Sequence, residues 1–147
     1  MPKRKPKGVS QLKKDVWKVF SRYVRYRDAL LTTGKPEYIL CITCGKRKNT
    51  KSVDAGHFIT CGKEPTRFDE RNVHGQCKHC NAFEDKIKVS AAYEKAMIGM
   101  YGKKQVDELK ALSNQLKRWT KKELLELLAF YKEELKSMEK EYGKVWK

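Results

Sequence analysis

The fold of this 147-residue chain is decided between Cys41 and Asn81, a stretch that opens with Cys41-Ile42-Thr43-Cys44 and closes with Cys77-Lys78-His79-Cys80-Asn81. Each end carries a Cys-x-x-Cys knuckle, and 32 residues lie between Cys44 and Cys77. Two such knuckles supply the four thiolates of a tetrahedral structural zinc site. The interval is longer than the roughly 15 to 20 residues of a simple zinc ribbon. We therefore expect an inserted element between the knuckles that carries further chemistry.

Residues suited to hydrolysis lie in and beside this insert. Asp54 and Asn81 offer hard oxygen ligands for Mg²⁺ or Mn²⁺, and Asn81 directly follows the last zinc cysteine. His57 is the natural general base near neutral pH. Because Asp54 and His57 are three residues apart in an extended segment, we expect a bulge or turn at Ala55-Gly56 to bring both to one side. The combination predicts phosphodiester hydrolysis with one catalytic metal ion.

The charge of the chain predicts a polyanionic partner. The formal net charge is +16, and residues 1–51 hold 15 Lys and Arg against 3 Asp and Glu. Next to a zinc module this asymmetry favours nucleic acid over a merely solvated helix face, with a membrane-surface helix as a weaker option. No signal peptide or membrane span is predicted, so we expect a reducing cytoplasm, thiolate–zinc ligation rather than disulfides, and a free thiol at Cys61.

The periodicity of the chain predicts three regions: a basic arm and helix over 1–37, a zinc-bound core over 38–89 and a helical tail over 90–147. We expect a helix over 10–31 with Ser10 as its N-cap, a strand over 38–40, a basic turn over 46–49, an extended segment over 52–59 and a helix over 81–89. Basic side chains on the first helix, interleaved with Trp17, Tyr23 and Tyr26, could form a phosphate-binding face or an ordinary exposed face.

Two helices are expected in the first part of the tail, one ending near Gly102 and one marked by Val106, Leu109, Leu112 and Leu116. A capping box at Thr120-Lys121-Lys122-Glu123 precedes an apolar seam at 124, 128, 131, 135, 138 and 142. The seam is short, so we expect it to pack on the preceding helix rather than to form a dimer.

Several motifs together resemble one family. They are FSRYVRYRD over 20–28, CITCG over 41–45, DAGHF over 54–58, RFDERNVHGQC over 67–77 and RWT over 118–120. The sequence resembles the lambdoid phage NinG (Rap) recombination family and, more widely, HNH (His-Me finger) nucleases with an H-N-N pattern. Its zinc-site layout is similar to that of phage T4 endonuclease VII. The resemblance implies an α+β fold, with a small zinc-stapled ββα-metal core flanked by an N-terminal basic helix and a C-terminal helical tail.

The resemblance also implies a structure-specific DNA endonuclease, encoded by a phage and acting on Holliday junctions and D-loops in the host cytoplasm. Asn72 would then orient the loop or His57, and Asp54 and Asn81 would hold the catalytic ion. His79 is expected at the surface, and His74 in a supporting role or at a phosphate. Zinc is expected at Cys41, Cys44, Cys77 and Cys80, and contacts with DNA at Lys18, Arg22, Arg25, Lys46, Arg47, Arg67, Arg71 and His74.

Two alternatives remain at this level, a non-catalytic zinc-dependent DNA-binding protein and, less favoured, an RNA-binding zinc protein. The expected partner is branched DNA. A homodimer on four-way junctions and contacts with phage or host recombination proteins stay open, because the apolar seam is too short to decide the oligomeric state.

Overall fold

A computed structural model describes residues 3–146 of the chain, with every side chain in that range except that of Phe83. It has mixed α+β architecture. The elements are α1 (Val9–Thr33), β1 (Tyr38–Leu40), β2 (Arg47–Asn49), β3 (Val53–His57), β4 (Val73–Cys77), α2 (Lys86–Tyr101), α3 (Lys103–Ser113) and α4 (Lys121–Tyr142). The strands form two antiparallel pairs, β1 with β2 and β3 with β4. Within the described range no helix has the length and apolar character needed to cross a membrane.

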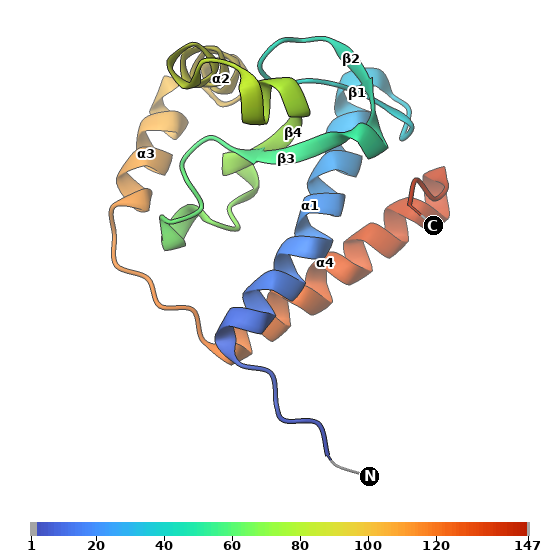
Figure 1. Ribbon diagram of the computed structural model, residues 1–147, viewed down its shortest axis with the longest axis vertical. Coiled ribbons are helices and arrows are strands. Elements are labelled where there is room, and N and C mark those ends of the chain that lie inside the picture. Colours follow the sequence, from blue (N-terminus) through green and yellow to red (C-terminus); the bar gives the residue numbers. More distant parts are fainter. Residues whose placement is uncertain (1–2, 147) are drawn as a thin grey trace.

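The long helix α1 is the element around which the others are arranged (Figure 1). It begins at Val9 rather than after Ser10, because Gly8 is extended and its carbonyl accepts the amide of Leu12 at 3.0 Å. Ser10 is therefore not the N-cap. The helix ends as expected at Gly34, whose φ of 75° suits a residue without a side chain.

The apolar seam of α4 packs on α1, not on the preceding helix α3, so that expectation is wrong. Leu124 and Tyr131 lie in one buried cluster with Val16 and Phe20 of α1. The two helices run side by side in the same direction, while the segment 114–120 leads back along the molecule to the start of α4 (Figure 1). The predicted capping box at Thr120 and Glu123 is present.

The β3–β4 pair is regular, and the predicted bulge at Ala55-Gly56 is absent. Its register runs without interruption from Val53 opposite Cys77 to His57 opposite Val73. A Cβ at Gly56 would come too close to the side-chain amide of Gln76 on the paired strand, so a larger residue here would require the Gln76 side chain to move. Residues 47–49, expected as a turn, form β2 and pair with β1.

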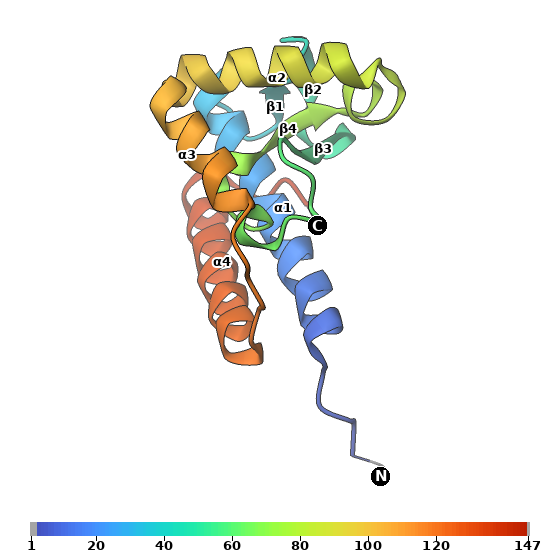
Figure 2. The same cartoon turned by 90° about the vertical axis from the view of Figure 1, so that its left-hand side faces the viewer.

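The helix expected over 81–89 is divided in two. A single π-helical turn spans His79–Phe83, and α2 then starts at Lys86, capped by the Asp85 carboxylate that accepts the amides of Ile87 and Lys88. The predicted boundary after residue 89 consequently falls inside α2. This helix lies across the strands (Figure 2), and the following α3 ends at Ser113, which leaves Leu116 outside it and fully exposed.

Candidate metal centre and active site

Four cysteines are brought together where β1, β4 and the π-helical turn meet. The Sγ atoms of Cys41, Cys44, Cys77 and Cys80 all lie within 4.8 Å of one another. Sulfur atoms around a tetrahedral zinc ion, with bonds of about 2.3 Å, would be about 3.8 Å apart, and the Cys44–Cys77 pair is at 3.9 Å. The four cysteines could thus bind a structural metal such as zinc. The free thiol expected at Cys61 is exposed and outside this cluster.

Backbone amides stabilise the thiolate form of Cys41 in the first knuckle. Burial alone would raise the pKa of Cys41, but hydrogen bonds from the amides of Cys44 and Cys77 and from Thr43 lower it to about 6. The Cys77 amide lies 3.2 Å from the Cys41 sulfur. Burial raises the pKa of Cys80 to about 12, so a metal ion would have to displace its proton on binding.

Asp54 and Asn81 are in direct contact, although 27 residues separate them. The Nδ2 of Asn81 donates to Oδ2 of Asp54 at 3.2 Å, and the ammonium of Lys78 lies 2.8 Å from Oδ1. The Asp54 side chain is about one-third exposed, at 34%. The second knuckle positions both partners of Asp54, because Lys78 directly follows Cys77 and Asn81 directly follows Cys80.

His57 lies at the end of β3 and is held on two sides. Its Nε2 is 3.0 Å from the carbonyl oxygen of Arg67, which can only accept, so Nε2 carries the proton. The ring stacks on Trp17 of α1 with centroids 4.8 Å apart and planes 20° from parallel. Burial lowers the pKa of His57, outweighing the hydrogen bond to Arg67. A neutral imidazole with an unprotonated Nδ1 results.

On a regular strand, Asp54 and His57 project to opposite faces. Trp17 connects them, because it stacks on His57 and also lines a cleft together with Ser21, Arg25, Asp54, Ala55 and Asn81. Ala55 and Asn81 in turn border a second cleft that contains His57. Asp54, His57 and Asn81 therefore line two clefts that share Ala55 and Asn81, but the three side chains are not all in contact.

Asn72 is completely buried and joins the strand β3 to the loop that follows it. Its Oδ1 accepts the amide of Ile59 at 2.7 Å, and its Nδ2 donates to the carbonyls of Ile59 and Thr66 at 2.9 and 3.0 Å. The loop so fixed leads directly to Arg67, whose carbonyl orients His57. Asn72 has no access to solvent, and its predicted role in orienting the loop or His57 stays a prediction.

His74 is only 2% exposed, which corrects the expectation that it contacts DNA. Tyr93 donates its hydroxyl proton to the carbonyl of Gly56 at 2.7 Å, so it accepts from Nδ1 of His74 at 3.1 Å. Tyr101 then donates to Nε2 at 2.8 Å. Burial lowers the pKa of His74 to about 4. This histidine is a neutral structural group, as the supporting alternative proposed.

The other residues expected to contact DNA differ in their exposure and in the contacts that their side chains already make within the protein. Lys18 and Lys46 are exposed, and Arg47 lies over the ring of Tyr38 at 3.9 Å. Arg71 is held by both carboxylate oxygens of Asp69.

Arg67 lies 3.5 Å from Glu64, while Arg22 and Arg25 lie over the ring of Trp146. Tyr26 is fully buried and Tyr23 bonds to Glu70, so neither is placed to stack on a base. His79 is at the surface, paired with Glu84.

Sequence reasoning missed Lys78 and Trp146 and left Trp17 without a role at the site. Lys78 could have been found, because it precedes Asn81 by one helical turn within the second knuckle. The positions of Trp17 and Trp146 depend on how α1 and the C-terminal segment pack, for which the sequence contains no local signal.

Comparisons with known proteins agree with the resemblance in the motifs. The family model described as Bacteriophage Lambda NinG protein matches residues 1–141. The chain is 37% identical to "Protein ninG" of Escherichia phage 933W over 99 residues, and 36% identical to those of Escherichia phage lambda and Salmonella phage P22. Each match covers 67% of this chain and 47% of the relative, so the chain spans about half the length of these proteins. No solved structure matches the chain. The chain belongs to the NinG family of bacteriophage proteins.

Proposed function

We propose that this chain is a metal-dependent DNA endonuclease that acts on branched DNA, with His57 as its general base. The observation that carries this proposal is the orientation of His57. Its Nε2–H is donated to the Arg67 carbonyl, and burial keeps the ring neutral, so Nδ1 is available to take a proton from a water molecule. Unlike His74, whose two ring nitrogens both bond to tyrosine hydroxyls, His57 uses only Nε2 in a hydrogen bond within the described residues.

The residues around His57 support the same chemistry. Trp17 limits rotation of the imidazole by stacking, and Asn72 fixes the loop that supplies the orienting carbonyl. The β3–β4 pair followed by a turn and helix α2 is compatible with a ββα-metal core, in which the strand pair carries the base and the following turn carries a metal ligand. In this proposal His57 accepts the proton of the attacking water and Asn72 acts only as a positioning residue.

Asp54 and Asn81 are the residues that would hold a divalent cation. A partly exposed carboxylate and an amide oxygen are ligands that Mg²⁺ and Mn²⁺ accept, and both ions usually complete their shells with water and phosphate oxygens. When bound, the ion would stabilise negative charge on the phosphate and the leaving oxygen. The Asn81 side chain must present Oδ1 to the ion, and Lys78 must release the Oδ1 of Asp54.

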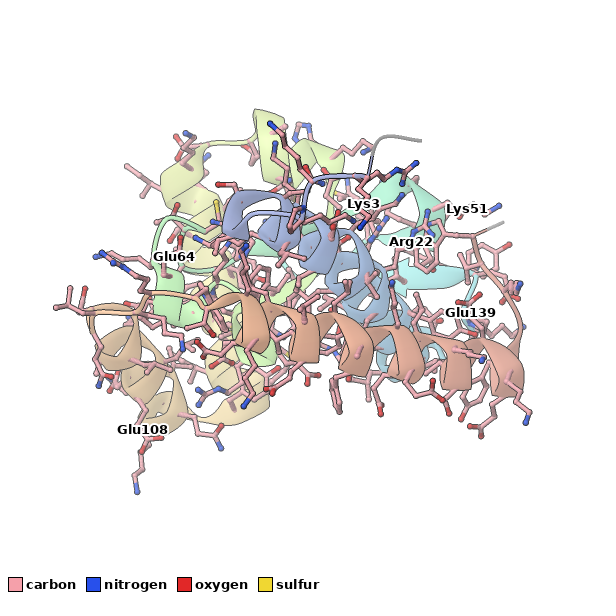
Figure 3. The ribbon with its side chains drawn as sticks, turned by 90° about the horizontal axis from the view of Figure 1, so that it is seen from below. Lys3, Arg22, Lys51, Glu64, Glu108 and Glu139 are labelled. Atoms are coloured by element: carbon pink, nitrogen blue, oxygen red, sulfur yellow. The ribbon has the colours of Figure 1, made fainter. Side chains whose placement is uncertain are left out.

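DNA is the proposed substrate because the site borders the basic part of the chain. Figure 3 shows Lys3, Arg22 and Lys51 on one side of the molecule, where Glu139 also lies, while Glu64 and Glu108 lie on another. Basic side chains attract the phosphate backbone without reading sequence. Recognition by backbone and shape suits a substrate defined by its branching.

A cleavage assay tests this function. Zinc-loaded protein would be incubated with a four-way junction, a D-loop and linear duplex DNA, with and without Mg²⁺. We expect Mg²⁺-dependent cutting of the branched substrates and a loss of at least about 100-fold in rate for His57→Ala. The matched control is His79→Ala, which removes an exposed imidazole paired only with Glu84.

Circular dichroism, zinc content and junction binding should be unchanged in both variants. If His57→Ala cuts at the rate of the unmodified protein, the assignment of the base is wrong. If no variant and no condition produces cutting while junction binding persists, the chain is a non-catalytic zinc-dependent DNA-binding protein.

A further inference from the structure

The C-terminal segment folds back onto α1 and places an aromatic ring beside the active site. After α4 the hydroxyl of Tyr26 donates to the carbonyl of Gly143 at 2.5 Å, and Val145 is buried against Tyr26 and Leu135. Trp146 then lies next to Tyr26, with ring centroids 6.4 Å apart. This segment thus joins the end of the described chain to the middle of α1.

Two arginines of α1 lie over the Trp146 ring. The guanidinium carbon is 4.8 Å from the ring centroid for Arg25 and 5.7 Å for Arg22. Arg25 is also fixed by its own N–H groups, which donate to the Ser21 carbonyl at 3.0 Å, the Val53 carbonyl at 3.3 Å and the Ser21 hydroxyl at 3.4 Å. Three of the five N–H groups are used in this way, and the remaining two are available to a ligand.

Neither arginine has a carboxylate within 4.0 Å among residues 3–146. Burial and the neighbouring Arg22 lower the pKa of Arg25, and only Asp54 acts in the opposite direction. Asp54 shares a cleft with Arg25, but its oxygens are bonded to Lys78 and Asn81. A fixed, partly buried arginine without a carboxylate partner is suited to binding an external anion.

We propose that Arg22 and Arg25, seated on Trp146, form a binding site for the phosphodiester backbone of DNA next to Asp54 and Asn81. The proposal rests on the proposed function for the identity of the anion. Guanidinium groups bind phosphate oxygens in pairs of parallel hydrogen bonds and also stack on aromatic faces. Arg25 would contact the DNA directly, and Trp146 is a positioning residue that acts through the two arginines.

Junction binding at a series of salt concentrations tests the site without requiring cleavage. Zinc-loaded protein without added Mg²⁺ would be titrated into a labelled four-way junction. The variants are Arg22→Met and Arg25→Met, which keep the packing against Trp146 but remove the charge. The matched control is Arg118→Met. Arg118 is exposed and lies just before the N-terminal end of α4, whereas Trp146 follows its C-terminal end.

We expect each of the first two variants to bind about tenfold more weakly and to reduce the slope of log affinity against log salt by about 0.9, while Arg118→Met changes neither. Trp146→Leu should weaken binding about threefold, and Trp146→Phe should weaken it less, because an aromatic ring is kept. In a protein in which Arg22 and Arg25 are both methionine, Trp146→Leu should have no further effect.

Unchanged affinity and salt slope in both arginine variants would overturn the site, as would an equal loss in Arg118→Met or a complete lack of junction binding. A Trp146→Leu loss that persists without the arginines would refute the positioning role. Arginine-dependent binding by a protein that never cuts DNA would reject the nuclease and leave the phosphate site intact.

Discussion

Protonation of His74 should destabilise the folded protein as the pH falls. The imidazole is neutral between the hydroxyls of Tyr93 and Tyr101 and is 2% exposed. A second proton on the ring, at Nε2, would require the Tyr101 hydroxyl to turn from donor to acceptor and would leave a cation in a buried site. Two charged groups also act on the pKa of His74: Asp28 favours the cation and Arg27 opposes it.

The magnitude follows from the pKa of His74, about 4 in the folded state against 6.5 as its ordinary value. The unfolded chain binds more protons between these two values, so the free energy of unfolding decreases with decreasing pH in that window. The stabilisation is fully present above about pH 6.5, and between about pH 7.5 and about pH 5 roughly 2 kcal/mol should be lost.

Urea unfolding of zinc-loaded protein at about pH 7.5 and about pH 5 measures this loss. The comparison is with His74→Gln, which cannot titrate in this range. Release of zinc by acid contributes equally to both proteins, so the difference between their pH dependences isolates His74. Tyr101→Phe is the control, because it removes a hydrogen bond to the ring but leaves the ring able to titrate.

Between about pH 7.5 and about pH 5, we expect the free energy of unfolding of His74→Gln to fall by about 2 kcal/mol less than that of the unmodified protein. Tyr101→Phe should keep the full pH dependence. Equal pH dependences for His74→Gln and the unmodified protein would refute the reasoning, since they would mean that the folded and unfolded states bind a proton to His74 equally well.

Three further predictions concern the candidate site. Asn72→Ala should lower the free energy of unfolding by about 2 to 4 kcal/mol in urea denaturation, because it leaves the buried amide of Ile59 and the carbonyl of Thr66 without partners. Cys44→Ser should lower the zinc content and the helical circular dichroism signal together, since structural zinc binding supplies folding free energy. The acid limb of the cleavage rate should lie below pH 6.5, because burial lowers the pKa of His57 and the base is active only when neutral.

Local patterns in the sequence were sufficient where neighbouring residues determine the structure. The Cys-x-x-Cys spacing predicts the four-cysteine cluster, because each knuckle presents two sulfurs from one turn. The capping box at Thr120 and the glycine ending α1 were likewise predictable, since each satisfies backbone groups within a few residues. Proximity of Asp54 and Asn81 was expected because both carry oxygen atoms suited to the same ion, and the structure brings the two side chains into contact.

Contacts between distant segments were not predictable from periodicity. The seam at Leu124 and Tyr131 shows that one face of a helix is apolar, but not which helix covers it, and α1 rather than α3 does so. The expected bulge was wrong for a similar reason, because the uninterrupted register of β3 depends on its pairing with β4, which is distant in the sequence. His74 was assigned to DNA because its burial depends on α2, whose register the sequence did not fix.

The pairing of α1 with α4 has a consequence for how the protein folds during synthesis. Tyr26 and Gly143 are bonded across a sequence separation of 117 residues. The apolar face of α1 is therefore among the first parts to be made and among the last to be covered. Contacts between distant segments close slowly, since loop entropy is lost before they form. Until α4 is complete, the nascent chain lacks Leu124 and Tyr131, which cover Val16 and Phe20 in the folded protein.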